Sequence, residues 1–174
     1  KIKIISNNIC YGPCPMPEDE VEQHLTIADD GRVWFSGYNF GNANGKYERN
    51  RTKQYRLDKE KTERIFSAFT RFFSGEFEDI FATDIGTWEM TITNTEGRDF
   101  HFNGSLCADY KIDGTDLSDL IRNALEMDDL YIFDGNCKPD KVNRIVVYYN
   151  RTAKIKPGKM PDNVTWEYVT WDYS

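Results

Sequence analysis

This chain has no long apolar run, only two histidines and no excess of positive charge. No stretch of 18 consecutive apolar residues exists, so the sequence predicts no membrane-spanning helix. The start, Lys1 to Ser6, has no apolar signal stretch, although a leader removed earlier would leave the same start. With 22 basic and 29 acidic residues, the formal charge is −7, which argues against a general nucleic-acid binder and permits a basic protein partner.

Recognisable cofactor and catalytic motifs are also missing. The sequence contains no phosphate-binding P-loop, no dinucleotide fingerprint, no zinc-protease helix motif and no EF-hand spacing. It therefore predicts no cofactor. Whether the protein is an enzyme is left open by the residues, and the absence of a complete catalytic set favours a protein that is not one.

Four cysteines are spread over the chain: Cys10, Cys14, Cys107 and Cys137. The first two are four residues apart among glycine and proline, which differs from the spacing of most zinc knuckles. We expect four reduced thiols. A disulfide framework or a zinc site that gathers all four remains the alternative.

The stretch from Thr83 to Met127 gives the clearest prediction of secondary structure in the sequence. Apolar Trp88, Met90 and Ile92 alternate with polar residues, and the return strand repeats the alternation. A three-residue loop, 95–97, pairs Ile92 with Phe100 and Met90 with Phe102, whereas a two-residue loop would mix apolar and polar side chains on one face. A helix capped by Thr115 or Asp116 follows, and its apolar stripe is Leu117, Leu120, Ile121, Ala124 and Leu125.

An earlier hairpin and helix precede this pair. Strands over 21–28 and 33–40 are joined at Asp30-Gly31, a dipeptide typical of a two-residue type I′ turn. That turn places Ile27 opposite Trp34, Leu25 opposite Ser36 and Val21 opposite Phe40. Asp58 then caps a helix to about Ser74, whose stripe is Ile65, Phe66, Phe69, Phe72 and Phe73.

These patterns predict an α+β fold with an antiparallel sheet and two amphipathic helices packed on one face. We expect a single domain over residues 1–174, built from hairpin-plus-helix halves at 18–75 and 83–136. Two further strands are predicted at 143–150 and 165–173. The last strand is aromatic, and an unpaired edge there would invite association with another chain.

Candidate site residues are few, and each has a structural explanation beside the functional one. His24 and His101 are predicted on the polar faces of the two hairpins, where they are solvated or, with a carboxylate, form a catalytic or metal site. Cys107 could act as a nucleophile with His101 as its base. A loop with Asp134, Asn136 and Asp140 weakly suggests a calcium site.

Four segments carry a resemblance: Thr83–Met90 (TDIGTWEM), Gly104–Asp109 (GSLCAD), Asp116–Arg122 (DLSDLIR) and Leu130–Asn136 (LYIFDGN). In these the chain resembles a group of uncharacterised proteins from Gram-positive bacteria, in which the chain often continues beyond the position of Ser174. The resemblance implies a cytoplasmic bacterial protein, and it supplies no catalytic residues to carry over.

The functional expectation is a non-enzymatic binding or protein-interaction module in the cytoplasm. It would bind another protein, or associate with itself through the carboxy-terminal edge strand, without nucleic-acid or membrane partners. One alternative is an immunity or antitoxin-like protein whose acidic surface neutralises a basic toxin. Another is a hydrolase that uses His24, His101 and a carboxylate.

Overall fold

The computed structural model describes residues 1–9, 14–42, 46–135, 144–149 and 167–172. The chain divides into two compact units, Lys1–Cys137 and Lys138–Ser174, and each is described by itself. The single domain expected over residues 1–174 therefore stays a prediction. No helix among the described residues is long and apolar enough to span a membrane.

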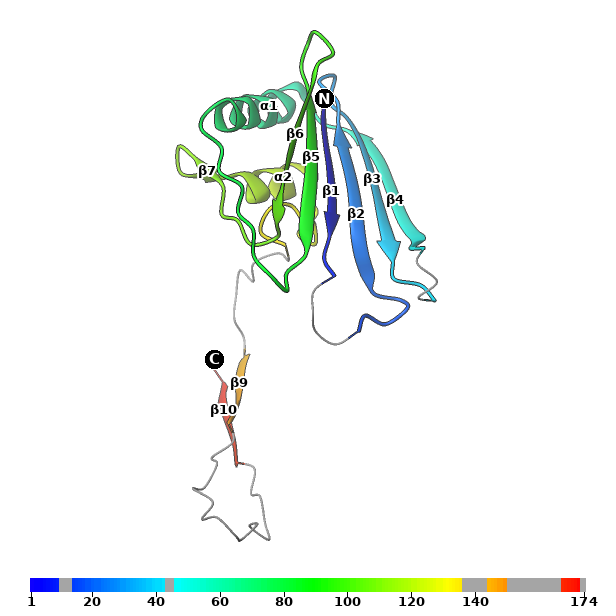
Figure 1. Cartoon of the computed structure of the whole chain (residues 1–174), viewed down its shortest axis with the longest axis vertical. Coiled ribbons are helices and arrows are strands. Elements are labelled where there is room, and N and C mark those ends of the chain that lie inside the picture. Colours follow the sequence, from blue (N-terminus) through cyan, green and yellow to red (C-terminus); the bar gives the residue numbers. More distant parts are fainter. Residues whose placement is uncertain (10–13, 43–45, 136–143, 150–166, 173–174) are drawn as a thin grey trace. The chain divides into compact units, whose positions relative to one another are not determined.

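A six-stranded antiparallel sheet organises the first unit, in the order β4-β3-β2-β1-β5-β6 (Figure 1). Its strands are β1 (Ile2–Asn7), β2 (Glu20–Ile27), β3 (Arg32–Asn39), β4 (Glu48–Arg56), β5 (Thr87–Thr93) and β6 (Asp99–Ser105). The two predicted hairpins share this sheet, and β1 lies between them, paired with β2 on one side and β5 on the other.

Helices α1 (Lys59–Phe73) and α2 (Leu117–Leu125) lie on the same side of the sheet (Figure 1). Both begin where the sequence predicts. The Asp58 carboxylate accepts a hydrogen bond from the Lys61 amide, and the Asp116 carboxylate accepts from Ser118 and Asp119. A short ladder of β7 (Lys111–Ile112) and β8 (Thr115–Asp116) precedes α2. The predicted α+β class, with helices on one face, is confirmed.

The face that the helices cover, here called the inner face, carries an aromatic core. Trp88, Phe35, Phe69 and Phe133 are fully buried, and the stripe of α2 is buried throughout. In α1, Ile65, Phe69 and Phe73 are buried while Phe66 and Phe72 are half-buried against the core. The apolar positions of the sequence thus serve as scaffold.

Register is confirmed in the second hairpin and wrong in the first. Met90 pairs with Phe102 and Ile92 with Phe100, as predicted, with Gly97 at φ 79° in the loop. In the first hairpin Leu25 pairs with Phe35 and Ile27 with Val33, one residue from the predicted register. The Ala28 amide bonds to the Arg32 carbonyl, so this loop also has three residues, 29–31. Burial favours this register because apolar side chains then meet on one face.

In the second unit, β9 (Arg144–Tyr149) and β10 (Glu167–Asp172) pair as a separate two-stranded antiparallel sheet. Both strands fall inside the segments that the sequence predicts as strands. Cys14 and Cys107 are free thiols, whereas Cys10 and Cys137 lie among residues that the structure does not describe.

Candidate functional site

Two β-bulges interrupt the sheet at one end. One falls in β2 between Glu20 and Glu22, and the other falls where Gly37 and Tyr38 of β3 pair with Arg51 and Arg49 of β4. A bulge adds a residue to one strand and so changes which face the following side chains occupy. Both bulges lie beside Tyr38. At this end of the sheet, successive side chains therefore do not simply alternate between the two faces.

The first bulge turns Glu20 toward the inner face. Its carboxylate accepts two hydrogen bonds of 2.7 Å from the Arg51 guanidinium, which also contacts the Phe35 ring at 4.9 Å. These bonds to Glu20 raise the pKa of Arg51. The carboxylate occupies the space where a side chain on Gly37 would lie, so any larger residue there would displace Glu20 from Arg51.

The second bulge turns Arg49 toward the opposite, outer face. Its guanidinium lies over the Tyr38 ring, 5.6 Å from the centroid, and donates a 3.3 Å hydrogen bond to the Tyr38 hydroxyl. Without the extra residue in β4, Arg49 would share the inner face with Arg51. The bulge therefore places a cation on an aromatic ring that faces away from the core.

Around Tyr38 the outer face carries a connected set of polar and aromatic side chains. The His24 ring lies 4.6 Å from the Tyr38 ring, and its Nε2 is 2.7 Å from a Glu22 carboxylate oxygen. The Asn7 amide donates to Glu22 and to the Tyr47 hydroxyl, each at 3.2 Å. We call this set, Asn7, Glu22, His24, Tyr38, Tyr47 and Arg49, the outer-face cluster.

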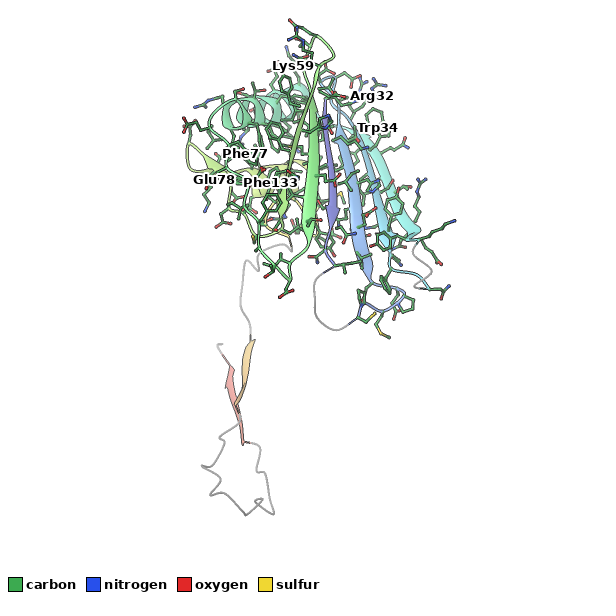
Figure 2. All side chains as sticks on the ribbon, in the orientation of Figure 1. Arg32, Trp34, Lys59, Phe77, Glu78 and Phe133 are labelled. Carbon is green, nitrogen blue, oxygen red and sulfur yellow. The ribbon has the colours of Figure 1, made fainter. Side chains whose placement is uncertain are left out.

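The outer-face cluster is open to solvent yet ordered by its own contacts. The His24 side chain is 33% exposed and that of Glu22 is 20% exposed, while both described helices of the unit pack on the inner face. Farther along β3 and toward its other end, the Arg32 guanidinium lies over the Trp34 ring (Figure 2). Aromatic rings with guanidinium groups, held in place before any partner arrives, make a surface suited to binding.

Three open clefts lie among the described residues. A cleft of about 540 Å³ runs beside Tyr55, and one of about 490 Å³ lies between Arg64 and Asp119. Both are lined mainly by charged and polar residues. The third, of about 250 Å³, is lined in part by Glu89 and His101.

The structure does not bring His24 and His101 together. They lie on β2 and β6, and β1 and β5 separate those strands, so the histidines are at least about 14 Å apart at the usual strand spacing. His101 instead contacts the Thr91 hydroxyl through Nδ1 at 3.3 Å. The two imidazoles cannot share a substrate or a metal ion in this arrangement.

Cys107 and His101 also lie apart. His101 sits within β6, while Cys107 follows the end of that strand. The four residues from His101 to Ser105 already span about 13 Å of extended strand, beyond the reach of a hydrogen bond. Cys107 is exposed, and the structure supplies it with no His101 base.

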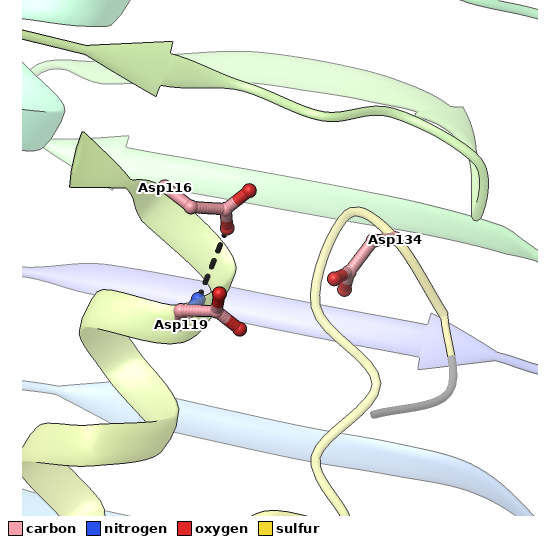
Figure 3. Close-up of side chains that lie close together, drawn as sticks. All are labelled: Asp116, Asp119 and Asp134. Carbon is pink, nitrogen blue, oxygen red and sulfur yellow. Dashed lines mark hydrogen bonds between the residues drawn. The ribbon is translucent and has the colours of Figure 1, made fainter. Parts of the chain in front are cut away.

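Asp134 belongs to a buried ion pair. It lies near Asp116 and Asp119 (Figure 3), and carboxylate oxygens of the three lie within 4.8 Å of one another. The cation among them is Arg122, which donates to Asp134 at 2.9 Å, to Asp119 at 3.1 Å and to the Leu130 carbonyl. The ion-pairing side chains of Arg122 and Asp134 are 5% and 4% exposed, so this arrangement joins α2 to the chain after it. Asn136 and Asp140, the other predicted calcium ligands, lie outside the described residues.

Of the outer-face cluster, sequence reasoning identified only His24. The contact between Arg49 and Tyr38 depends on the second bulge, whose extra residue is Asn50. Asparagine is uncommon in strands, but its presence alone does not predict a bulge. Tyr38, Tyr47 and Arg49 are close together in the sequence. The predicted register placed Tyr38 on the core face of the first hairpin, however, and Tyr47 and Arg49 lie beyond that hairpin.

Fold and site together define an α+β protein whose antiparallel sheet carries both helices of the described residues on one face. No family model matches the sequence, no curated protein matches it, and no solved structure matches the fold. The resemblance to proteins of Gram-positive bacteria therefore stays a prediction.

Proposed function

We propose that the protein is a non-enzymatic binding module that holds a protein partner against the open face of its sheet. One observation carries the proposal: the second bulge places Arg49 over the Tyr38 ring on the outer face, although burial of the core does not need this contact. Irregularities of this kind are enriched at functional sites because they redirect side chains. The cluster supplies tyrosine rings and a guanidinium group, and tyrosine and arginine are residue types enriched at protein interfaces.

A site-specific crosslinking experiment tests this surface. A photoreactive amino acid is placed at Tyr38 in the full chain and, as a control, at Gln54, an exposed residue elsewhere on the outer face. We expect a discrete crosslinked species from position 38, lost on Arg49→Ala, and none from position 54. Equal labelling at both positions, or insensitivity to Arg49→Ala, would contradict the proposal.

Self-association through the second unit is a second candidate. Strands β9 and β10 form a sheet of only two strands, and such ribbons are marginally stable unless other strands or helices pack against them. A proline in β9, Val147→Pro, removes a ladder donor and should dissolve any dimer built by strand pairing. Sedimentation velocity of the full chain before and after the change measures the effect. A monomer in both cases would end this candidate.

The proposal assigns no cofactor and no nucleic-acid partner, in keeping with the charge of −7, and it places the protein in the cytoplasm. The hydrolase alternative would need a site built on one of its two histidines, since three strand spacings separate His24 from His101. The immunity or antitoxin-like alternative requires an acidic contact surface, and the first unit has a segment of that kind.

A further inference from the structure

The connection between α1 and β5 is a long segment without helix or strand. It runs from Ser74 to Gly86 across the described part of the first unit. Connections of this length without regular structure are uncommon in compact domains and often have a binding role. We call residues 76–85 the acidic loop.

The acidic loop is fixed to the core at two points. The Phe77 ring packs against Phe73 at 5.2 Å and Phe102 at 5.3 Å, on the inner side of the sheet with Phe133 (Figure 2). Beyond it, the Ile80 carbonyl accepts from the Ser105 amide, and the Ala82 amide donates to the Ser105 hydroxyl, both at 2.9 Å. Ser105 is buried, so the loop is held at the end of β6.

Between and beyond these anchors the loop exposes large apolar side chains. Phe81 is 64% exposed, Ile80 41% and Ile85 39%, which makes three of the five large apolar side chains exposed in the described residues. Single exposed apolar residues are common, but three within six positions on an anchored loop form a patch. The loop therefore presents an apolar contact surface.

Negative charge surrounds the apolar patch. The loop contains Glu76, Glu78, Asp79 and Asp84 and has no lysine or arginine. No ion pair to any of the four is found among the described residues. Burial raises the pKa of the neighbouring Tyr110 to about 12, and the Asp79 carboxylate adds to that shift. The negative charge of the loop is thus available to attract a positively charged partner.

We propose that the acidic loop docks a basic protein segment, with Phe81 as the apolar anchor and the four carboxylates contacting its lysine or arginine side chains. This surface is separate from the outer-face cluster and independent of it. Complementary charge speeds the encounter and selects the partner. The aromatic anchor, which becomes buried on binding, supplies most of the affinity. Recognition of this kind fits an immunity or antitoxin-like protein that captures a cationic toxin.

The test measures binding of the full chain to a labelled synthetic peptide of alternating lysine and leucine by fluorescence anisotropy. Phe81→Ser should weaken binding by about tenfold or more, because an anchor is removed without a change in charge. Phe100→Ser removes an exposed phenylalanine, 48% exposed, outside the loop, and should change the affinity by less than about twofold. If Phe81→Ser alters the urea midpoint, Ile85→Ser replaces it.

A second matched pair tests the charges. Glu76→Gln with Glu78→Gln should weaken binding several-fold at low salt and less at high salt, because salt screens exposed charges. Glu18→Gln with Glu60→Gln removes two exposed carboxylates elsewhere and should have a smaller effect. A peptide of lysine and serine should bind weakly.

Three results would overturn the proposal. Equal losses from Phe81→Ser and Phe100→Ser would show that any exposed ring serves. Equal losses from the two carboxylate pairs would reduce the effect to net charge. A dimer that Phe81→Ser dissolves would assign the loop to a second copy of this chain instead of a basic partner.

Discussion

The two faces of the six-stranded sheet are built by different rules. On the inner face the alternation of each strand delivers apolar side chains to the helices, and Ile2, Ile4, Leu25 and Met90 are all buried. On the outer face the strands carry polar side chains, and regular pairing brings Asn7, Glu22, His24 and Tyr38 together. The bulge in β4 then adds Arg49 to them. Regular register thus builds the core, and one irregularity completes the candidate site.

The largest expected contrast between the faces is between two tryptophans. Trp88 is fully buried on the inner face, and Trp88→Ala should cost about 3–5 kcal/mol of unfolding free energy by leaving a cavity. Trp34 is half-buried on the outer face, and Trp34→Ala should cost about 1 kcal/mol or less. Urea denaturation measures both. Similar costs would mean that the outer face is covered in solution.

The buried ion pair gives the next effect. Asp134→Asn leaves the Arg122 guanidinium without its main counter-charge and should cost about 2–3 kcal/mol. The same site discriminates a salt bridge from a calcium site. Because Arg122 supplies the cation, millimolar calcium should not raise the melting temperature of the natural chain, whereas a shift of several degrees would restore the calcium hypothesis.

A smaller effect is expected at the first bulge. Gly37→Ala places a methyl group where the Glu20 carboxylate lies, and the carboxylate has to leave Arg51 to make room. We expect a loss of about 1–2 kcal/mol, measured by urea denaturation. Gly97→Ala serves as the contrasting control, because its Cβ has open space and only the positive φ opposes it.

Tyr55 and Tyr110 should make the stability of the fold depend on pH only in alkali and not near neutral pH. Burial raises the pKa of Tyr55 to about 12, with Glu126 contributing, and the pKa of Tyr110 is raised to the same value. A raised folded-state pKa stabilises the fold fully below pH 10, the unfolded value, and the stabilisation is lost as the pH approaches 12.

Absorbance of tyrosinate during an alkaline titration checks this expectation. The folded chain should retain a late-titrating component that Tyr55→Phe and Tyr110→Phe each reduce. The urea-unfolded chain should titrate in one step near pH 10. A folded chain that titrates in the same single step would contradict the burial of both side chains.

Sequence reasoning succeeded where one physical rule acted alone. The loop at 95–97 followed from alternation, and the cap of α1 followed from Asp58 placed before an apolar stripe. For α2 the sequence left Thr115 and Asp116 as alternatives, and Asp116 is the cap. In the first hairpin two rules competed. The Asp30-Gly31 signal favoured a two-residue turn, but burial of Leu25 opposite Phe35 selected a three-residue loop.

The candidate site could not be predicted from the sequence for a different reason. Its geometry depends on pairings between strands, such as Asn7 with Glu22 and Tyr38 with Arg49, and on a bulge in β4 that local alternation does not predict. The insertion of β1 between the two hairpins was also unpredictable, and it separates His24 from His101. Local patterns define strands, whereas the order of the strands depends on the packing of the whole chain.

The central position of β1 has a consequence for how the chain acquires its structure during synthesis. Strands β1 to β4 are successive neighbours and can pair as they emerge from the ribosome, but the second edge of β1 has no partner until residues 87–93 have been made. Until then β1 is itself an edge strand, open to pairing with other nascent chains. Closing this long-range contact is therefore expected to be the slow step of folding, and a truncation before β5 should aggregate.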